Sequence, residues 1–185
     1  MAFYDLSESE RMAMTERAIA ERRTVMERWR ALDNPEAQPW NERAARVARL
    51  LEGCASVADL GCGNMQLEPY LAEGVRYVPV DVVARDARTL VVDLNREAPP
   101  ALDVEGWSTI GLLEYLYDVP ALLSALSGTL VATYNPVDLS EQNRRGHAWV
   151  NDWSTAEVEG LFRDANWTVV ESETFGVQQI WKLSR

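Results

Sequence analysis

From Ser56 onward, short apolar runs alternate along the chain with segments of helical pattern, and this alternation limits the folds that the chain can adopt. The runs are bounded by Gly, Pro, Asp and Asn residues, as buried strands are. Strands that alternate with helices form a mostly parallel sheet with helices on its faces, so we expect an α/β fold. The runs are Ser56–Leu60, Val75–Val80, Leu90–Val92, Trp107–Gly111 and Thr129–Tyr134.

The last part of the chain has a different pattern, which predicts a β-hairpin. Trp167–Glu173 and Val177–Leu183 alternate apolar and polar residues, and Phe175-Gly176 lies between them. Such alternation is typical of strands with one buried face, and glycine permits a tight turn between them. We expect this hairpin to add an antiparallel strand to the sheet.

Capping sequences and apolar spacing predict helices between and before these strands. Ser154 with Glu157 is a capping-box pair that would open a helix ending near Ala165. Asp118 is the expected N-cap of another helix. The remaining helical patterns are Asn41–Glu52, Gln66–Ala72 and Asp118–Leu126.

The N-terminal segment predicts one long amphipathic helix. Ser7 and Glu10 form a capping-box pair, apolar residues then recur at helical spacing as far as Leu32, and Asn34-Pro35 would end the helix. We expect a single domain over residues 1–185, with residues 1–39 as a helical extension and residues 40–185 as the core.

Two connections between the predicted strands are too short for ordinary crossover helices. About eight residues separate the second and third strands, and about thirteen separate the third and fourth. A crossover with its helix needs roughly 10–12 residues or more. We therefore expect shortened or missing helices there, with the N-terminal helix or a partner subunit covering the sheet, and the same helix is a candidate surface for a homodimer.

Composition excludes several functional classes. The 185 residues carry a formal net charge of −11, which disfavours a surface that wraps nucleic acid. No apolar run has the roughly 18–20 residues of a membrane span, and the N-terminus has no signal-peptide pattern. Cys54 and Cys62 form no metal-binding spacing, and His147 is the single histidine. We expect a cytoplasmic protein without a metal ion.

The segment Val57–Asn64, with the sequence Val-Ala-Asp-Leu-Gly-Cys-Gly-Asn, carries the strongest functional signal. A predicted strand leads into a glycine turn, where Gly61 and Gly63 would let the backbone turn sharply and approach a ligand. The dinucleotide fingerprint G-x-G-x-x-G would place its third glycine at position 66, which is Gln66. The turn therefore does not follow the NAD-binding pattern.

An aspartate two residues before the first glycine is instead the arrangement of class I S-adenosylmethionine (SAM) dependent methyltransferases, which residues 55–185 resemble. Their motif is similar to D-x-G-x-G-x-G, and Met65 stands at its final glycine. The resemblance implies a Rossmann-like, mostly parallel seven-stranded sheet with a C-terminal antiparallel hairpin. It also implies that Asp59, Gly61, Cys62 and Gly63 bind the cofactor, and that Met65 makes the turn bulkier than usual.

The same resemblance assigns the residues that follow the next three strands. Asp81 ends the second strand, where a carboxylate accepts hydrogen bonds from the ribose hydroxyls of an adenosine, and Val82 would pack on the adenine. Asp93 would accept from the adenine amino group, and Leu94 would offer its backbone amide. Three residues after the fourth strand would lie near the sulfonium end of SAM, namely Gly111, Leu112 and Glu114.

The acceptor side is expected above the carboxyl ends of the strands, in the stretch 135–153. His147 is a candidate general base, and Glu114 is a second catalytic candidate that equally fits a structural role. Arg144 or Arg145 would hold an acidic group of the acceptor, and Trp40 would cover the cofactor or pack at a helix start.

Together these features predict an enzyme that moves a methyl group from SAM to a small-molecule or sugar-like metabolite, at oxygen or nitrogen, leaving S-adenosylhomocysteine (SAH). Two alternatives remain at this point. One is an NAD- or nucleotide-sugar-binding enzyme, against which Gln66 argues. The other is a non-catalytic subunit that binds SAM or SAH and regulates a partner chain.

Overall fold

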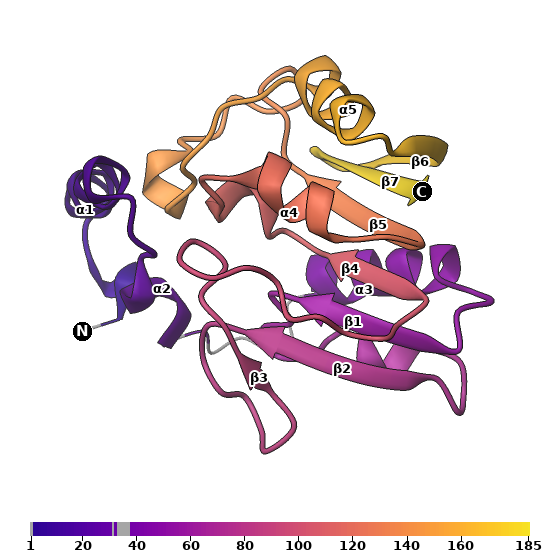
Figure 1. Cartoon of the computed structure of the whole chain (residues 1–185). Helices are drawn as coiled ribbons and strands as arrows, with labels where there is room; N and C mark the ends of the chain where they lie inside the picture. Colours follow the sequence, from indigo (N-terminus) through magenta and orange to yellow (C-terminus); the bar gives the residue numbers. More distant parts are fainter. Residues whose placement is uncertain (1, 31, 33–37) are drawn as a thin grey trace.

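The computed structural model of the chain describes residues 2–30, 32 and 38–185, and within them seven strands form one sheet (Figure 1). The strand order is β3-β2-β1-β4-β5-β7-β6. The first five strands are parallel, whereas β7 runs antiparallel to β5 and β6, so the predicted α/β sheet with its closing hairpin is confirmed. The strands are β1 (Ser56–Leu60), β2 (Arg76–Asp81), β3 (Leu90–Val91), β4 (Gly106–Thr109), β5 (Thr129–Tyr134), β6 (Thr168–Phe175) and β7 (Gln178–Ser184).

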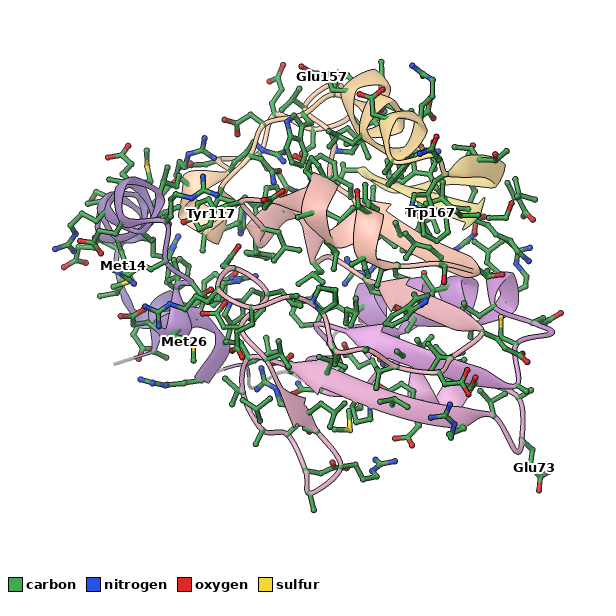
Figure 2. The ribbon with its side chains drawn as sticks, in the orientation of Figure 1. Met14, Met26, Glu73, Tyr117, Glu157 and Trp167 are labelled. Carbon is green, nitrogen blue, oxygen red and sulfur yellow. The ribbon has the colours of Figure 1, made fainter. Side chains whose placement is uncertain are left out.

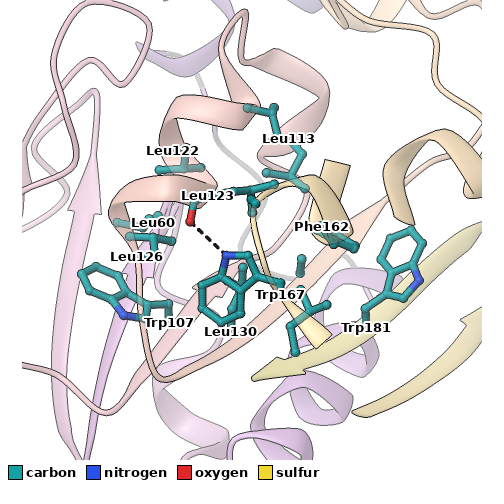
Figure 3. Packing of buried hydrophobic residues seen from close by; sticks show 14 of the residues in the cluster. Leu60, Trp107, Leu113, Leu122, Leu123, Leu126, Leu130, Phe162, Trp167 and Trp181 are labelled. Carbon is teal, nitrogen blue, oxygen red and sulfur yellow. Dashed lines mark hydrogen bonds between the residues drawn. The ribbon is translucent and has the colours of Figure 1, made fainter. Parts of the chain in front are cut away.

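Helices α4 (Val119–Ala125) and α5 (Thr155–Asp164) pack on one face of the sheet and form the larger hydrophobic core (Figure 3). Trp167 lies in this core and donates its indole N–H to the Leu123 carbonyl at 2.9 Å, so its one polar atom is satisfied. Phe162 of α5 packs edge-to-face on Trp181 of β7, with ring centroids 5.3 Å apart.

Helix α3 (Gln38–Leu50) packs on the opposite face, where Val47 and Leu50 contact alternate residues of the strands such as Val57 and Val131. The sheet is therefore buried on both faces, as parallel sheets are. The helix begins before the predicted Asn41, so residue 39, the predicted end of the extension, falls inside it.

The two short crossovers contain no helix in the structure, as predicted. The residues between β3 and β4 instead pack against the larger core themselves, through partly buried Val92, Leu94, Leu102 and Val104. The sequence predicts that the N-terminal helix or a partner subunit covers this surface. For the N-terminal helix the prediction is wrong, because among the described residues an irregular segment rich in apolar side chains supplies the cover. Cover by a partner subunit stays a prediction.

The prediction of one long N-terminal helix is also wrong. The segment forms a short 3-10 turn η1 (Phe3–Asp5), helix α1 (Glu8–Glu21) and a short helix α2 (Met26–Arg30). The helix α1 stops because Arg22 adopts a left-handed conformation, with φ of 49°. The hydroxyl of Tyr117 lies 2.9 Å from the Ala18 carbonyl and 3.1 Å from the Arg23 carbonyl, so a tertiary contact fixes this break. Asn34 and Pro35 lie outside the described residues.

The predicted helix Gln66–Ala72 is reduced to a 3-10 turn, η2 (Glu68–Tyr70). Pro69 has no backbone N–H and fits the first turn of a helix, but the chain turns away at once toward β2. The capping pairs elsewhere form as predicted. Asp118 accepts the amide of Ala121 at 3.0 Å, and Ser154 accepts the amide of Glu157 at 3.3 Å.

The N-terminal helices lie beyond the carboxyl ends of the strands (Figure 1). There α1 packs against the turn η4 (Arg145–His147), and Thr15 donates its hydroxyl to the Arg145 carbonyl at 2.7 Å. Figure 2 shows Tyr117 on the side of the sheet that faces the helices carrying Met14 and Met26. The N-terminal segment is thus docked on the sheet edge where ligands bind in α/β folds. In the described part of the chain, no helix is long and apolar enough to cross a membrane.

Candidate functional site

A cavity of about 500 Å³ lies at the carboxyl ends of the parallel strands, beneath the N-terminal helices. Its wall is built from the ends of β1, β2, β3 and β4, from α2 and α3, and from the turn η4. All the predicted cofactor residues and both catalytic candidates lie on this wall: Asp59, Gly61, Cys62, Gly63, Asp81, Val82, Asp93, Leu94, Gly111, Leu112, Glu114 and His147. Residues widely separated in the sequence therefore meet at one place.

The glycine turn after β1 has the backbone geometry that only glycine adopts without strain. Gly61 and Gly63 have φ of 71° and 51°, and the amide of Gly61 donates to the Val80 carbonyl at 2.8 Å. A Cβ atom on Gly61 would lie 2.9 Å from a methyl carbon of Leu112. Glycine at position 61 therefore permits the close approach of the segment after β4.

Met65 takes the left-handed conformation that a glycine would have at the same place, with φ of 57°. Its sulfur lies 3.6 Å from a guanidinium nitrogen of Arg88, an exposed residue in the β2–β3 connection. The side chain thus points toward Arg88, and the bulkier turn that the sequence predicts does not narrow the cavity. A left-handed non-glycine residue costs about 1–2 kcal/mol, which the surrounding turn must offset.

Asp81 closes the glycine turn from the end of β2. One carboxylate oxygen accepts the amide of Gly63 at 2.9 Å, and the other accepts the amide of Val83 at 2.9 Å and pairs with Arg85 at 3.2 Å. A carboxylate has about four acceptor positions, so these three contacts leave capacity for a ligand. The same contacts fix the carboxylate against the turn.

Asp93 connects the end of β3 with the N-terminal segment. Its Oδ1 accepts the hydroxyl of Thr24 at 2.6 Å and the amide of Asn95 at 3.1 Å. The side-chain amide of Asn95 in turn donates to Thr24 and to the Tyr115 carbonyl. The loop between α1 and α2 is therefore tied directly to a predicted cofactor residue.

Asp59 is a buried carboxylate on the floor of the cavity. Tyr77 donates its hydroxyl to Oδ2 at 2.8 Å, whereas Oδ1 is buried with no hydrogen-bond partner among the described residues. Burial raises the pKa of Asp59 to about 6, although the hydrogen bond from Tyr77 opposes the shift. An unpaired buried carboxylate oxygen is the kind of atom that a cationic group of a ligand would satisfy.

Cys62 lies in the same turn but is chemically inert there. Burial raises the pKa of its thiol far above the ordinary value, and the nearby carboxylates of Asp59 and Asp81 add to the shift. The thiol therefore stays protonated, which excludes it as a nucleophile at neutral pH.

Glu114 lies in the 3-10 turn η3 (Leu113–Tyr115) and is only 1% exposed. One oxygen accepts the amide of Asn135 at 3.0 Å, and the other is buried without a partner in the described structure. Burial raises the pKa of Glu114, and the positive charges of Arg43 and Arg144 oppose that rise. The Glu114 carbonyl also accepts the amide of Val150 at 2.8 Å, so this residue joins two loops of the site.

His147 lies in η4, half-buried against the ring of Trp149 with centroids 5.1 Å apart. Burial lowers the pKa of the imidazole, and the positive charges of Arg28 and Arg11 lower it further. The imidazole is therefore neutral at pH 7 and able to accept a proton.

The two arginines predicted to hold the acceptor are engaged in the structure of the loop instead. Arg144 donates to the Asn135 carbonyl at 2.8 Å and to the Tyr134 hydroxyl at 2.8 Å. Arg145 pairs with Asp152 at 2.5 Å and donates to the Trp149 carbonyl. Neither lines the cavity, so the expectation that they hold an acidic group of the acceptor is wrong.

Two other arginines, which the sequence analysis missed, line the cavity. Arg43 of α3 donates to the side chain of Gln178 at 2.9 Å and lies beside Gly111, where a Cβ atom would be 3.2 Å from its guanidinium. Arg28 of α2 reaches the cavity from the other side. Tyr115, Asn135 and Trp29 also line it, as does Trp40. No local motif marks these residues, because they meet only after the N-terminal segment has docked.

No protein-family model matches the sequence, and no curated protein matches it either. Solved structures match its fold. The chain superposes with a TM-score of 0.63 and 18% identity on a Burkholderia thailandensis 1,6-didemethyltoxoflavin-N1-methyltransferase bound to its substrate and SAH, covering 83% of this chain and 80% of that one. A SAM-dependent methyltransferase from Aquifex aeolicus gives a TM-score of 0.63 at 17% identity, with 83% and 95% covered.

Larger methyltransferases contain the same core. The mitomycin 7-O-methyltransferase matches with a TM-score of 0.65 and 16% identity over 96% of this chain and 67% of that one. This chain spans about half the length of other similar structures, such as 51% of an O-methyltransferase from neocarzinostatin biosynthesis. The sheet order and these matches show that the chain has the Rossmann-like fold of the class I SAM-dependent methyltransferases.

Proposed function

We propose that this protein is an enzyme that transfers a methyl group from SAM to a small molecule, at oxygen or nitrogen. The observation that carries the proposal is the meeting of the glycine turn, Asp81 and Asp93 on the wall of one cavity. The similar structures include methyltransferases bound to SAM or SAH and to small-molecule substrates, which supports the same chemistry here.

The residues present fit SAM, whose adenosine and methionine parts need different partners. Asp81 would accept the ribose hydroxyls through its remaining acceptor capacity, and Asp93 would accept the adenine amino group, with Val82 and Leu94 beside the ring. The unpartnered Oδ1 of Asp59 fits a cationic ammonium group. When bound, SAM supplies a methyl group activated on a sulfonium.

Arg43 is the matching partner for the methionine carboxylate. Its guanidinium lies beside Gly111, two residues after β4, and among the described residues its hydrogen-bond acceptor is the neutral side chain of Gln178. Burial lowers the pKa of Arg43, and the nearby Glu114 opposes that shift. A ligand carboxylate would therefore compensate a positive charge that the cavity leaves underpaired.

The chain's own residues would align the acceptor and hold its proton. Methyl transfer depends mainly on proximity and orientation. Neutral His147 would accept the proton of an acceptor hydroxyl. We assign Glu114 a positioning role. Its carboxylate accepts the amide of Asn135 and its backbone carbonyl accepts the amide of Val150, so the residue holds two loops in place rather than facing bulk solvent.

Calorimetric titration with SAM and with SAH tests this function. Wild-type protein should bind both with micromolar affinity, and Asp81→Ala should weaken binding at least about 30-fold because the ribose acceptor and the anchor of Gly63 are lost together. Asp86→Ala is the matched control, since Asp86 is exposed, pairs with Arg88 and lies off the cavity. Absence of binding by the wild-type chain would refute the proposal.

The regulatory alternative uses the same cofactor site without turnover. A complex with a Haloferax volcanii methyltransferase activator is among the similar structures, so partner-dependent methyltransferases occur in this fold. The enzyme proposal has the better support, because the cavity extends past the expected cofactor residues to His147, Tyr115 and Asn135. Measured SAH release in the presence of acceptor by the isolated chain separates the two.

The residues 2–30 complete the cavity wall through Tyr4, Thr24, Arg28 and Trp29. We therefore propose that the N-terminal extension and the core act as one functional unit within a single domain. A cytoplasmic location and a homodimer through the N-terminal helices remain proposals as well.

A further inference from the structure

Arg28 is a buried cation in the part of the cavity wall that the N-terminal helices supply. Its side chain is 6% exposed and lies among the rings of Tyr4, Trp29 and Tyr115, at 4.9, 5.0 and 5.4 Å from their centroids. Nη2 donates to the Tyr115 hydroxyl at 3.0 Å, and Nη1 donates to the Tyr4 hydroxyl. Aromatic faces and two phenol oxygens are its described partners.

No carboxylate of the described residues pairs with Arg28. By contrast, the mostly buried Arg85 and Arg144 pair with Asp81 and Asp152. A guanidinium has five N–H donors, of which Arg28 uses two, and its Nε is buried without a partner in the described structure. A buried charge without a counter-charge costs several kcal/mol, and stacking on aromatic rings offsets only part of that cost. Among the described residues, the positive charge of Arg28 thus has no counter-charge.

The hydroxyl of Tyr115 shows which kind of group would bind beside Arg28. Its oxygen accepts from Arg28 Nη2 at 3.0 Å and from the indole N–H of Trp149 at 2.9 Å. Both partners are obligate donors, and a hydroxyl has two acceptor positions and one proton. The proton of Tyr115 is therefore left to donate to a third group. Arg28 and Tyr115 thus both present donors, and Tyr115 lines the cavity beside Arg28.

The two proposed parts of the cavity differ in charge. The cofactor part holds the carboxylates of Asp59, Asp81 and Asp93 together with Arg43, and this negative sum suits the net positive charge of SAM. The other end holds Arg28 and the neutral imidazole of His147, whose pKa Arg28 helps to lower. A negatively charged acceptor would complement this end and would be repelled by the first.

The shape and composition of the same end favour a planar ligand. The rings of Trp29 and Tyr115 meet edge-to-face with centroids 4.6 Å apart, and Trp40 and Trp149 also line the cavity. Aromatic side chains offer large flat surfaces on which a ring can stack. A planar group that bears one anionic substituent would stack on the rings and pair with the charge of Arg28.

We propose that the methyl acceptor is a small aromatic carboxylic acid, whose carboxylate binds Arg28 and the hydroxyl of Tyr115. This inference rests on the proposed methyl transfer and specifies its substrate class. Arg28 is the specificity-determining residue, and its two free η N–H donors and the Tyr115 proton are the groups that recognise the carboxylate.

The test measures binding to the full chain saturated with SAH. Calorimetry compares benzoate, 2-hydroxybenzoate, 4-hydroxybenzoate and 2-naphthoate with the corresponding amides, which keep the ring and lose the charge. At least one acid should bind 10-fold or more tightly than its amide, and Arg28→Gln should remove that preference. Arg30→Gln is the matched control, since Arg30 is exposed on the same helix and lies off the cavity.

The outcomes separate the two levels of the argument. If SAH binds and no acid binds more tightly than its amide, or if the preference survives in Arg28→Gln, the acceptor proposal is wrong. If SAH itself does not bind the wild-type chain, the proposed function fails first. Arg28→Lys guards against misfolding of the glutamine variant, because it keeps the buried charge and should keep part of the preference for acids. SAH affinity should be unchanged in all three variants.

Discussion

The two ends of the cavity are built in different ways. The cofactor end is acidic and consists of residues that directly follow strands β1, β2 and β3, held by backbone hydrogen bonds such as those from Gly63 and Val83 to Asp81. The acceptor end is aromatic and basic, and residues of α2, η3 and η4 line it. One end is fixed by local chain geometry, whereas the other depends on the docking of distant segments.

This difference means that backbone geometry defines the cofactor site, whereas side chains define the acceptor site. At the cofactor end, backbone hydrogen bonds to Asp81 and the left-handed glycines set the shape. The acceptor end uses the irregular segment 135–153 and the N-terminal helices, where side chains alone set shape and charge. Changes at one end should therefore leave the other largely intact.

The largest expected effect comes from removing the proposed base at the acceptor end. His147→Asn should lower kcat at least about 100-fold toward a hydroxyl acceptor while SAH affinity stays within about twofold. In the wild type, kcat should fall as pH drops through a pKa below the ordinary histidine value, because burial and Arg28 disfavour the imidazolium. Steady-state rates between pH 5 and 8 check this, and a profile that is the same in wild type and variant would contradict it.

Gly61→Ala should damage the cofactor end without touching the acceptor end. The new Cβ would lie 2.9 Å from Leu112, and φ of 71° strains any side chain, so we expect SAH affinity to fall about 10-fold or more and stability to drop by about 2 kcal/mol.

Gly74→Ala provides the matched control for this variant. Gly74 has φ of 86° but nothing within 4 Å of a built Cβ, so it should lose about 1 kcal/mol of stability and no SAH affinity. Equal effects of the two substitutions on SAH affinity would show that the contact with Leu112 is irrelevant to the cofactor end.

Asp59→Asn should change the stability of the ligand-free protein and its affinity for SAM in opposite directions. Because the folded pKa of about 6 lies above the ordinary aspartate value of 3.8, the folded state binds this proton more tightly than the unfolded state, so the group's contribution to stability falls as pH rises from about 4 to above 6. A neutral isostere should therefore stabilise the ligand-free protein by about 1–2 kcal/mol at pH 7 and weaken SAM binding. Urea unfolding with and without SAM measures both, and a destabilised ligand-free variant would contradict the account.

Met65→Gly should have the smallest effect. Glycine relieves the left-handed strain at φ of 57° but adds chain entropy to the unfolded state, so stability should rise by at most about 1 kcal/mol. SAH affinity should remain within about twofold, because the side chain faces Arg88. A larger change in affinity would place Met65 against the cofactor after all.

The residues of the cofactor end could be predicted from the sequence because each belongs to a short, contiguous motif. The predicted bounds of β1 and β5 match the structure, and the glycine turn, Asp81 and Asp93 all reach one cavity. Each assignment combined a strand pattern and the residues after it with the resemblance to the methyltransferases, and the parallel sheet then brings the carboxyl ends of its strands together.

The acceptor end could not be read in this way. The break at Arg22 depends on Tyr117, which is nearly a hundred residues away, and helical spacing alone favoured an unbroken helix. No sequence motif marks Arg28 or Arg43. The adjacent Arg144 and Arg145 were predicted to bind the acceptor, but in the structure both donate hydrogen bonds to carbonyls of nearby loop residues. The function of a charged residue therefore depends on its hydrogen-bond and ion-pair partners, which only the tertiary structure shows.

A crystal structure of the chain with SAH tests the central claim most directly. The account predicts that the adenine lies beside Asp93 and Val82, that the ribose hydroxyls bind Asp81, and that the methionine carboxylate binds Arg43, with the region between His147 and Arg28 left open for an acceptor. SAH bound with its adenine at Arg28, or outside this cavity, would contradict both the assignment of the two ends and the function built on it.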